Sequence, residues 1–112
     1  MKEVPKSVKR ALRELGGIAY DEELHRALVP LADAFDAWKA GKLSAGDLVD
    51  QIHTFHQGPA RELFLRYDRH LLSSSVAQAI ATGIIKRDSV PAEVLDHLSG
   101  LIKFHSNMEP RS

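Results

Sequence analysis

The sequence contains no cysteine, and this absence excludes several kinds of chemistry. Without thiols the chain cannot form a disulfide, a thiolate zinc site or a cysteine nucleophile. A net charge is missing as well, because 15 lysine and arginine residues balance 15 aspartate and glutamate residues. The whole molecule therefore exerts no overall electrostatic attraction on nucleic acid or on an anionic membrane, and any such preference has to come from a local patch.

Long apolar runs are also absent from the sequence. No stretch approaches the roughly 20 consecutive apolar residues that span a bilayer. Residues 1–17, MKEVPKSVKRALRELGG, lack the continuous apolar segment of a secretory signal. We therefore expect a cytoplasmic protein without a membrane span.

Strand patterns are rare too, because apolar and polar residues never alternate over more than about four positions, whereas helical spacing recurs throughout. The fold class that we predict is all-α. We assign residues 1–105 to a single compact domain of five to six helices and residues 106–112 to a frayed C-terminal tail. Short loops between the helices are compatible with an antiparallel bundle and with an orthogonal array, and the sequence does not choose between them.

The longest predicted helix covers residues 7–40. At 1.5 Å per residue it would be about 50 Å long, which exceeds the roughly 35 Å diameter of a compact chain of this size. Its apolar residues form two stripes, over residues 8–19 and 24–38, whose centres lie about 150° apart around a straight helix. Gly16 and Gly17 lie near the join of the two stripes. The helix is therefore either bent at these glycines or straight, with its two halves packed on different neighbours.

Four shorter helices follow in the prediction. Ser44, with Asp47 three residues later, is a typical N-cap for the first of them. Gly58 is expected to end that helix, and Pro59 suits the first position of the next, where the missing N–H would have no partner in any case. Pro91 opens the last helix in the same way. The approximate ranges are 44–57, 59–70, 75–85 and 91–105.

Three histidines raise the possibility of a metal site. His53 and His56 are three residues apart on one side of the second helix, and His25 lies on the first. His25 and His53 each follow an acidic residue by three positions, a spacing that echoes the ligand pairs of di-iron carboxylate bundles. In the alternative interpretation His56 is a hydrogen-bonded core residue and the other two lie at the rim of the core. His25, His53 and His56 are the candidate ligands for zinc or iron, and otherwise we expect no cofactor.

Basic residues gather at the start of the long helix, on the side opposite its first apolar stripe. They are Lys2, Lys6, Lys9, Arg10 and Arg13. A basic amphipathic helix of this kind can contact phosphates of nucleic acid or an anionic membrane, although such a row of cations is more often only the solvated side of the helix.

The same helix becomes acidic after its basic start, with a net charge of −5 over residues 14–36. Two copies laid antiparallel about a two-fold axis would place each basic end against the acidic stretch of the other. We therefore predict a homodimer whose contact includes Val8, Leu12 and Leu15. In the alternative, this apolar stripe packs on other helices of its own chain.

A second candidate surface lies within residues 47–70. Arg61, Arg66 and Tyr67 are of the residue types enriched at protein–protein hot spots, although they are equally compatible with the solvent-exposed side of a packed helix. The leading prediction is a non-enzymatic module that binds another protein and itself. A metal-binding bundle ranks second, and binding to nucleic acid or an anionic membrane ranks third.

Overall fold

The computed structural model describes residues 4–68 and 71–108, and within them every regular element is helical, as the sequence predicted. The elements are α1 (Lys6–Lys39), α2 (Ala45–Phe55), η1 (His56–Ala60), α3 (Arg61–Arg66), α4 (Leu72–Ala81), η3 (Arg87–Ser89) and α5 (Ala92–Met108). No helix of this described part combines the length and hydropathy needed to cross a bilayer. The predicted end of the third helix at His70 lies outside the described residues.

Gly58 and Pro59 do not end a helix. The chain passes from α2 into the π-helical turn η1 and then into α3, and Phe55, His56 and Ala60 all keep right-handed helical angles. A π-turn is wider than an α-turn, so it accommodates the proline ring and the missing N–H without a break. Because α2, η1 and α3 make one rod, the described residues form four helical rods, and the prediction of five to six helices was wrong.

The long helix α1 is uninterrupted. Gly16 and Gly17 lie inside it, and neither has a positive φ. The structure therefore has no break at these glycines, and the two halves of a continuous α1 pack on different neighbours. The first half contacts α4 and α5, whereas the second half contacts α2, η1 and α3.

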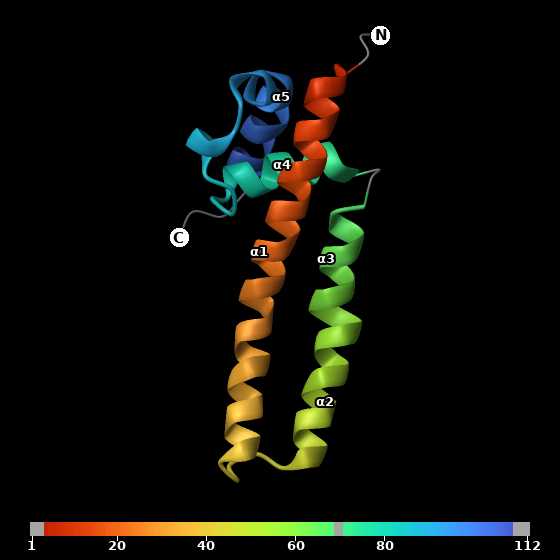
Figure 1. Ribbon diagram of the computed structural model, residues 1–112, viewed down its shortest axis with the longest axis vertical. Helices are drawn as coiled ribbons and strands as arrows, with labels where there is room; N and C mark the ends of the chain where they lie inside the picture. The colour runs from red at the N-terminus through yellow and green to blue at the C-terminus, as the bar shows by residue number, and fades with distance from the viewer. Residues whose placement is uncertain (1–3, 69–70, 109–112) are drawn as a thin grey trace.

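This division gives the molecule two parts (Figure 1). In the part that we call the head, residues 4–20 and 71–108, α4 and α5 gather around the first half of α1. In the stalk, residues 21–68, the second rod runs back along α1 as an antiparallel hairpin. The molecule measures 57 × 30 × 21 Å, and its radius of gyration is 17.3 Å, against about 13 Å for a compact chain of this length. The prediction of a compact domain was wrong because half of α1 projects beyond the core.

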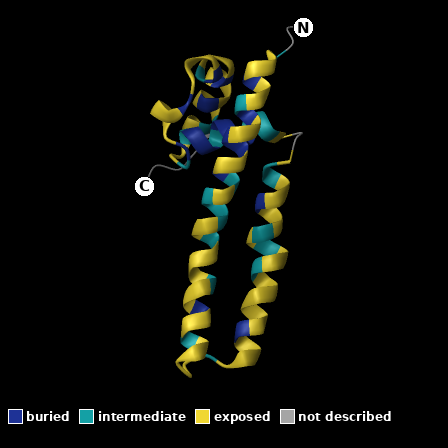
Figure 2. Cartoon of the chain, viewed as in Figure 1, coloured by how far each residue is buried: buried dark blue, intermediate teal, exposed yellow. Residues whose placement is uncertain are grey.

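The buried hydrophobic cluster of the described residues lies in the head, where most of the buried residues in Figure 2 are found. It is formed by Val8, Leu12, Leu15 and Ala19 of α1, Val76, Ala77, Ala79 and Ile80 of α4, Ile85, Val90, and Val94, Leu98 and Ile102 of α5. Val8, Leu12 and Leu15 are 1%, 5% and 6% exposed. The prediction that these three side chains contact a second copy is therefore corrected, because they are covered by their own chain.

Gly16 of α1 lies directly against α4. A Cβ atom on Gly16 would lie 2.5 Å from Leu72 Cδ1 and 3.8 Å from Val76 Cγ2, whereas a Cβ atom on Gly17 would meet open space. The missing side chain of Gly16 thus allows the two helices to approach closely. This packing explains a poor helix former in the middle of a long helix.

The ends of the helices follow the local signals in part. Ser44 caps α2 as predicted, since its Oγ accepts a hydrogen bond from the backbone N–H of Asp47 at 3.1 Å. α5 continues to Met108, so the fraying predicted from residue 106 does not begin there. Residues 109–112 of the predicted tail lie outside the described part of the chain.

Candidate functional site

The stalk exposes more large apolar side chains than it buries. Only Ala34, Leu48 and Leu63 are buried in it. Eight larger apolar residues are exposed: Leu28, Val29, Phe35, Trp38, Val49, Ile52, Phe64 and Leu65. Each helix of a two-rod hairpin has one neighbour along most of its length, so much of its apolar surface stays in contact with water (Figure 2).

On α1, the side that contacts the second rod differs from the side that carries the apolar stripe. The small residues Ala27 and Ala34 face the second rod, since Ala34 is buried and Ala27 lines cavities with Pro59. The stripe of Leu24, Leu28, Leu31, Phe35 and Trp38 is centred about 70° further round the helix. Its large side chains are therefore only partly covered.

The second rod presents apolar side chains on the same side of the hairpin. Tyr20 of α1 shares a cavity with His56 and Phe64, which places these three residues on one side. Val49 and Ile52 precede His56 by seven and four residues, so they lie on that side as well. We call the exposed apolar residues of this side the hairpin face, which consists of Leu28, Phe35, Trp38, Val49, Ile52 and Phe64.

The hairpin face carries exposed aromatic rings at both ends of the stalk. The rings of Phe35 and Trp38 contact edge to face near the stalk tip, with centroids 6.5 Å apart. At the base, Phe64 is 66% exposed, the largest fraction among the exposed apolar side chains of the described residues. Exposed aromatic and aliphatic side chains gathered on one side of a helical pair are typical of a surface that binds another protein.

A polar cluster ties the base of the stalk to α1. Arg66 Nη1 donates to Glu23 Oε1 at 2.9 Å, and Tyr67 Oη donates to Glu23 Oε2 at 2.5 Å. The ring of Tyr67 also packs on Tyr20, with centroids 5.8 Å apart. Burial of the phenol, together with its hydrogen bond to the Glu23 carboxylate, raises the pKa of Tyr67 well above its usual range.

This cluster changes the interpretation of the predicted partner-binding residues. Arg66 and Tyr67 are engaged with Glu23 inside the chain, so they hold the hairpin against α1. Arg61 is exposed and shares the cavity of Tyr20 and Phe64, which places it at the rim of the hairpin face. Of these three predicted residues, Arg61 alone lies beside the exposed apolar surface.

The predicted metal ligands do not form a site. His25, His53 and His56 are all exposed. In the described part of the chain, no three histidine, cysteine, aspartate or glutamate side chains are placed to hold one metal ion. The alternative interpretation, that His56 is a hydrogen-bonded core residue, also fails because His56 is exposed. The assignment of these histidines to zinc or iron is therefore corrected.

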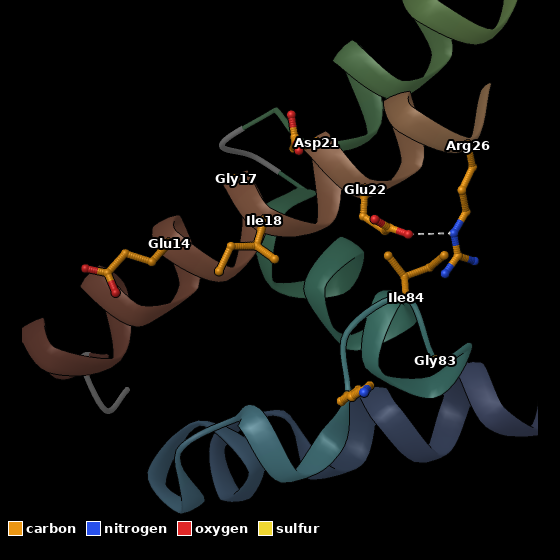
Figure 3. A pocket seen from close by; sticks show the side chains of 9 residues that line it. Glu14, Gly17, Ile18, Asp21, Glu22, Arg26, Gly83 and Ile84 are labelled. Atoms are coloured by element: carbon orange, nitrogen blue, oxygen red, sulfur yellow. Dashed lines mark hydrogen bonds and ion pairs between the residues drawn. The ribbon is translucent and has the colours of Figure 1, made fainter. Parts of the chain in front are cut away.

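An open groove of about 840 Å³ runs between α1 and the loop that follows α4 (Figure 3). Ile18 and Ile84 supply its apolar part, and the ion pair between Glu22 and Arg26, with Nε and Oε1 3.0 Å apart, lies beside Ile84. No serine, histidine or cysteine lines it. Its charged lining consists of Glu14, Asp21, Glu22, Arg26 and Lys86.

One serine–histidine contact was missed by the sequence analysis. Ser74 Oγ of α4 lies 3.0 Å from His105 Nε2 of α5, and the histidine ring contacts Phe104 edge to face. A serine nucleophile needs, besides its base, an oriented acid and donors for an oxyanion. Neither residue lines any cavity described above, so the contact joins the two helices. No sequence signal connects two residues that are 31 positions apart on separate helices.

The hairpin face is thus the feature of the described residues that departs most from an ordinary solvated surface. Comparisons of the chain with protein-family models, with curated proteins and with solved structures found no match.

Proposed function

We propose that the protein is a non-enzymatic interaction module that associates with itself through the hairpin face. The observation that carries this proposal is a projecting pair of helical rods that buries three residues and exposes six large apolar residues on one side. The proposal keeps the homodimer predicted from the sequence. It moves the contact from Val8, Leu12 and Leu15 to the second half of α1 and its neighbouring rod.

The hairpin of a second copy of the chain can cover this surface. Helices in water are stabilised mainly by packing of their apolar faces, and two antiparallel rods leave part of each face open. Two hairpins placed face to face would make a four-helix bundle with the apolar stripes inside. The partner that carries a matching apolar surface of the same length is a second copy of this chain, which can meet it through a self-complementary contact.

The area of the hairpin face is sufficient for such a contact. Its six side chains are between 36% and 66% exposed. With about 150–200 Å² for each large side chain, they leave on the order of 500 Å² per copy, or about 1,000 Å² for two. This value reaches the lower bound for a specific interface before the polar rim, including Arg61, is counted.

The proposal is tested by the mass of the untagged protein in solution. We expect native mass spectrometry and light scattering to show a dimer of twice 12.4 kDa, with a monomer appearing on dilution. Leu28→Glu and Phe64→Glu each place a charge in the apolar contact. Each should abolish the dimer while helical circular dichroism is retained, because both side chains are exposed in the monomer.

Matched controls lie one residue away. Val29 and Leu65 are 49% and 48% exposed, but they lie outside the hairpin face. Val29→Glu and Leu65→Glu should therefore leave the dimer intact. A wild-type monomer at all concentrations, or equal loss of the dimer in these controls, would contradict the proposal.

A further inference from the structure

The charged residues at the two ends of the stalk point to the orientation in which two copies meet. We infer that the stalks pack antiparallel, with the heads at opposite ends and with Asp21 of each copy beside Lys39 of the other. This inference rests on the proposed self-association through the hairpin face. It adds a pairing of residues and a shape for the dimer.

The first four residues of the apolar stripe are spaced symmetrically along α1. Leu24, Leu28, Leu31 and Phe35 are separated by four, three and four residues. A two-fold axis that is perpendicular to α1 and passes beside it, at the level midway between Leu28 and Leu31, therefore places Leu24 opposite Phe35 of the second copy. The same axis places Leu28 opposite Leu31, as in an antiparallel pair of packed helices.

Opposite charges flank these four residues, at distances from the axis that differ by one residue, or about 1.5 Å. Asp21 and Lys39 are 18 residues apart, which is about five full helical turns, so they lie on the same side of α1. Both are exposed, and neither takes part in the two salt bridges found within the described residues. The axis that aligns the leucines brings Asp21 of one copy to Lys39 of the other, twice per dimer.

The wider charge distribution favours the same orientation. The head has seven lysine and arginine residues against four acidic ones, a net charge of +3, whereas the stalk has five against nine, a net charge of −4. At the stalk tip, Lys39 and Lys42 are exposed, and at its base, Asp21 and Asp68 are exposed. An antiparallel dimer pairs each tip with a base. The opposite orientation gathers both positive heads at one end and both lysine tips at the other, and such juxtaposition of like charges selects against it.

The antiparallel arrangement makes the dimer a spacer with one head at each end. The stalk accounts for about 30 Å of the 57 Å length of one copy, at 1.5 Å per residue. Two copies that overlap along their stalks are therefore about 85 Å long. Two copies with their heads together stay close to the 57 Å of the monomer.

Because the chain has no cysteine, single introduced cysteines report the orientation directly. We expect a disulfide between Asp21→Cys and Lys39→Cys copies when the two are mixed and oxidised. Lys39→Cys mixed with Ala45→Cys should not cross-link, because these positions meet only if the heads lie at the same end. Small-angle scattering of the wild-type dimer should give a length of about 85 Å.

Charge exchange provides a second readout. Asp21→Lys and Lys39→Asp should each weaken the dimer severalfold, and the double variant should restore it, because the reversed pair is again complementary. A cross-link between positions 39 and 45, or a dimer close to 57 Å long, would overturn the antiparallel orientation and leave self-association standing. A wild-type monomer would instead remove the proposed function itself.

Discussion

The head and the stalk share one helix, yet they bury it to very different extents. In the head, α1 meets α4 and α5, and Val8 and Ala19 are 1% and 0% exposed. In the stalk it meets a single rod, and Leu28 and Phe35 remain 44% and 36% exposed. An apolar stripe determines which side of a helix can be buried, whereas the number of neighbouring helices determines how much of it is buried.

This difference divides the roles of the two parts. The head contains the hydrophobic core, so most of the free energy of folding arises there. The stalk is held at its base by the contacts of Glu23 with Arg66 and Tyr67 and gains few buried side chains of its own. Its apolar surface is therefore available for association, which would stabilise it by mass action.

The largest effect that separates head from stalk is expected for truncation of leucines. Leu98 of α5 is 0% exposed, so Leu98→Ala should lower the free energy of unfolding by about 3 kcal/mol through lost contacts and a cavity. Leu28→Ala should lower the free energy of unfolding by less than about 1 kcal/mol, because the side chain of Leu28 is already 44% exposed to solvent. Both changes are made in Phe64→Glu protein, so that association does not contribute, and urea unfolding is followed by circular dichroism. Equal losses would mean that the stalk is packed as tightly as the head.

The two central glycines provide a smaller and sharper comparison. Gly17→Ala should raise the free energy of unfolding by about 1 kcal/mol, since its Cβ meets open space and alanine favours the helix. Gly16→Ala gains the same propensity but forces Leu72 of α4 to move. We expect it to be at least about 1 kcal/mol less stable than Gly17→Ala. The test is the difference between the two melting curves, and equal stability would show that Leu72 moves at no cost.

The smallest effect is expected at the junction of head and stalk. Tyr67→Phe removes the hydrogen bond to Glu23 and should cost about 1 kcal/mol at neutral pH. Because the pKa of Tyr67 is raised on folding, its contribution is fully present below the unfolded pKa of about 10 and is lost as the pH rises above that value. The wild type should therefore lose stability in alkali more steeply than Tyr67→Phe. Parallel curves of unfolding free energy against pH would exclude this role for the phenol.

Sequence reasoning recovered the local features of the fold. The helical class, the cap at Ser44 and the two misaligned stripes of α1 follow from spacing and side-chain chemistry over a few turns, and the structure confirms them. The prediction that a helix ends at Gly58 was wrong, because the π-helical turn η1 accommodates Pro59 within a continuous rod. Spacing alone does not report such a turn, since it changes the hydrogen-bond register without changing the residue pattern.

The candidate site was recovered less well. The first stripe of α1 was assigned to a partner and the second was not, whereas the structure buries the first and exposes much of the second. Both stripes have the same kind of residues at the same spacing, so amphipathicity does not distinguish a covered side from an open one. The contacts of Glu23 with Arg66 and Tyr67 join positions 43 and 44 residues apart, beyond the reach of any local pattern.

The sequence by itself determined that this chain folds as helices, where most of them begin, and which side of each helix is apolar, because these properties depend on backbone geometry and on neighbours within a few residues. Only the tertiary structure decided that α4 and α5 cover the first stripe while one rod half covers the second. The reason is that burial depends on which distant segments come together, and a single glycine at position 16 allows one such approach that the stalk does not have.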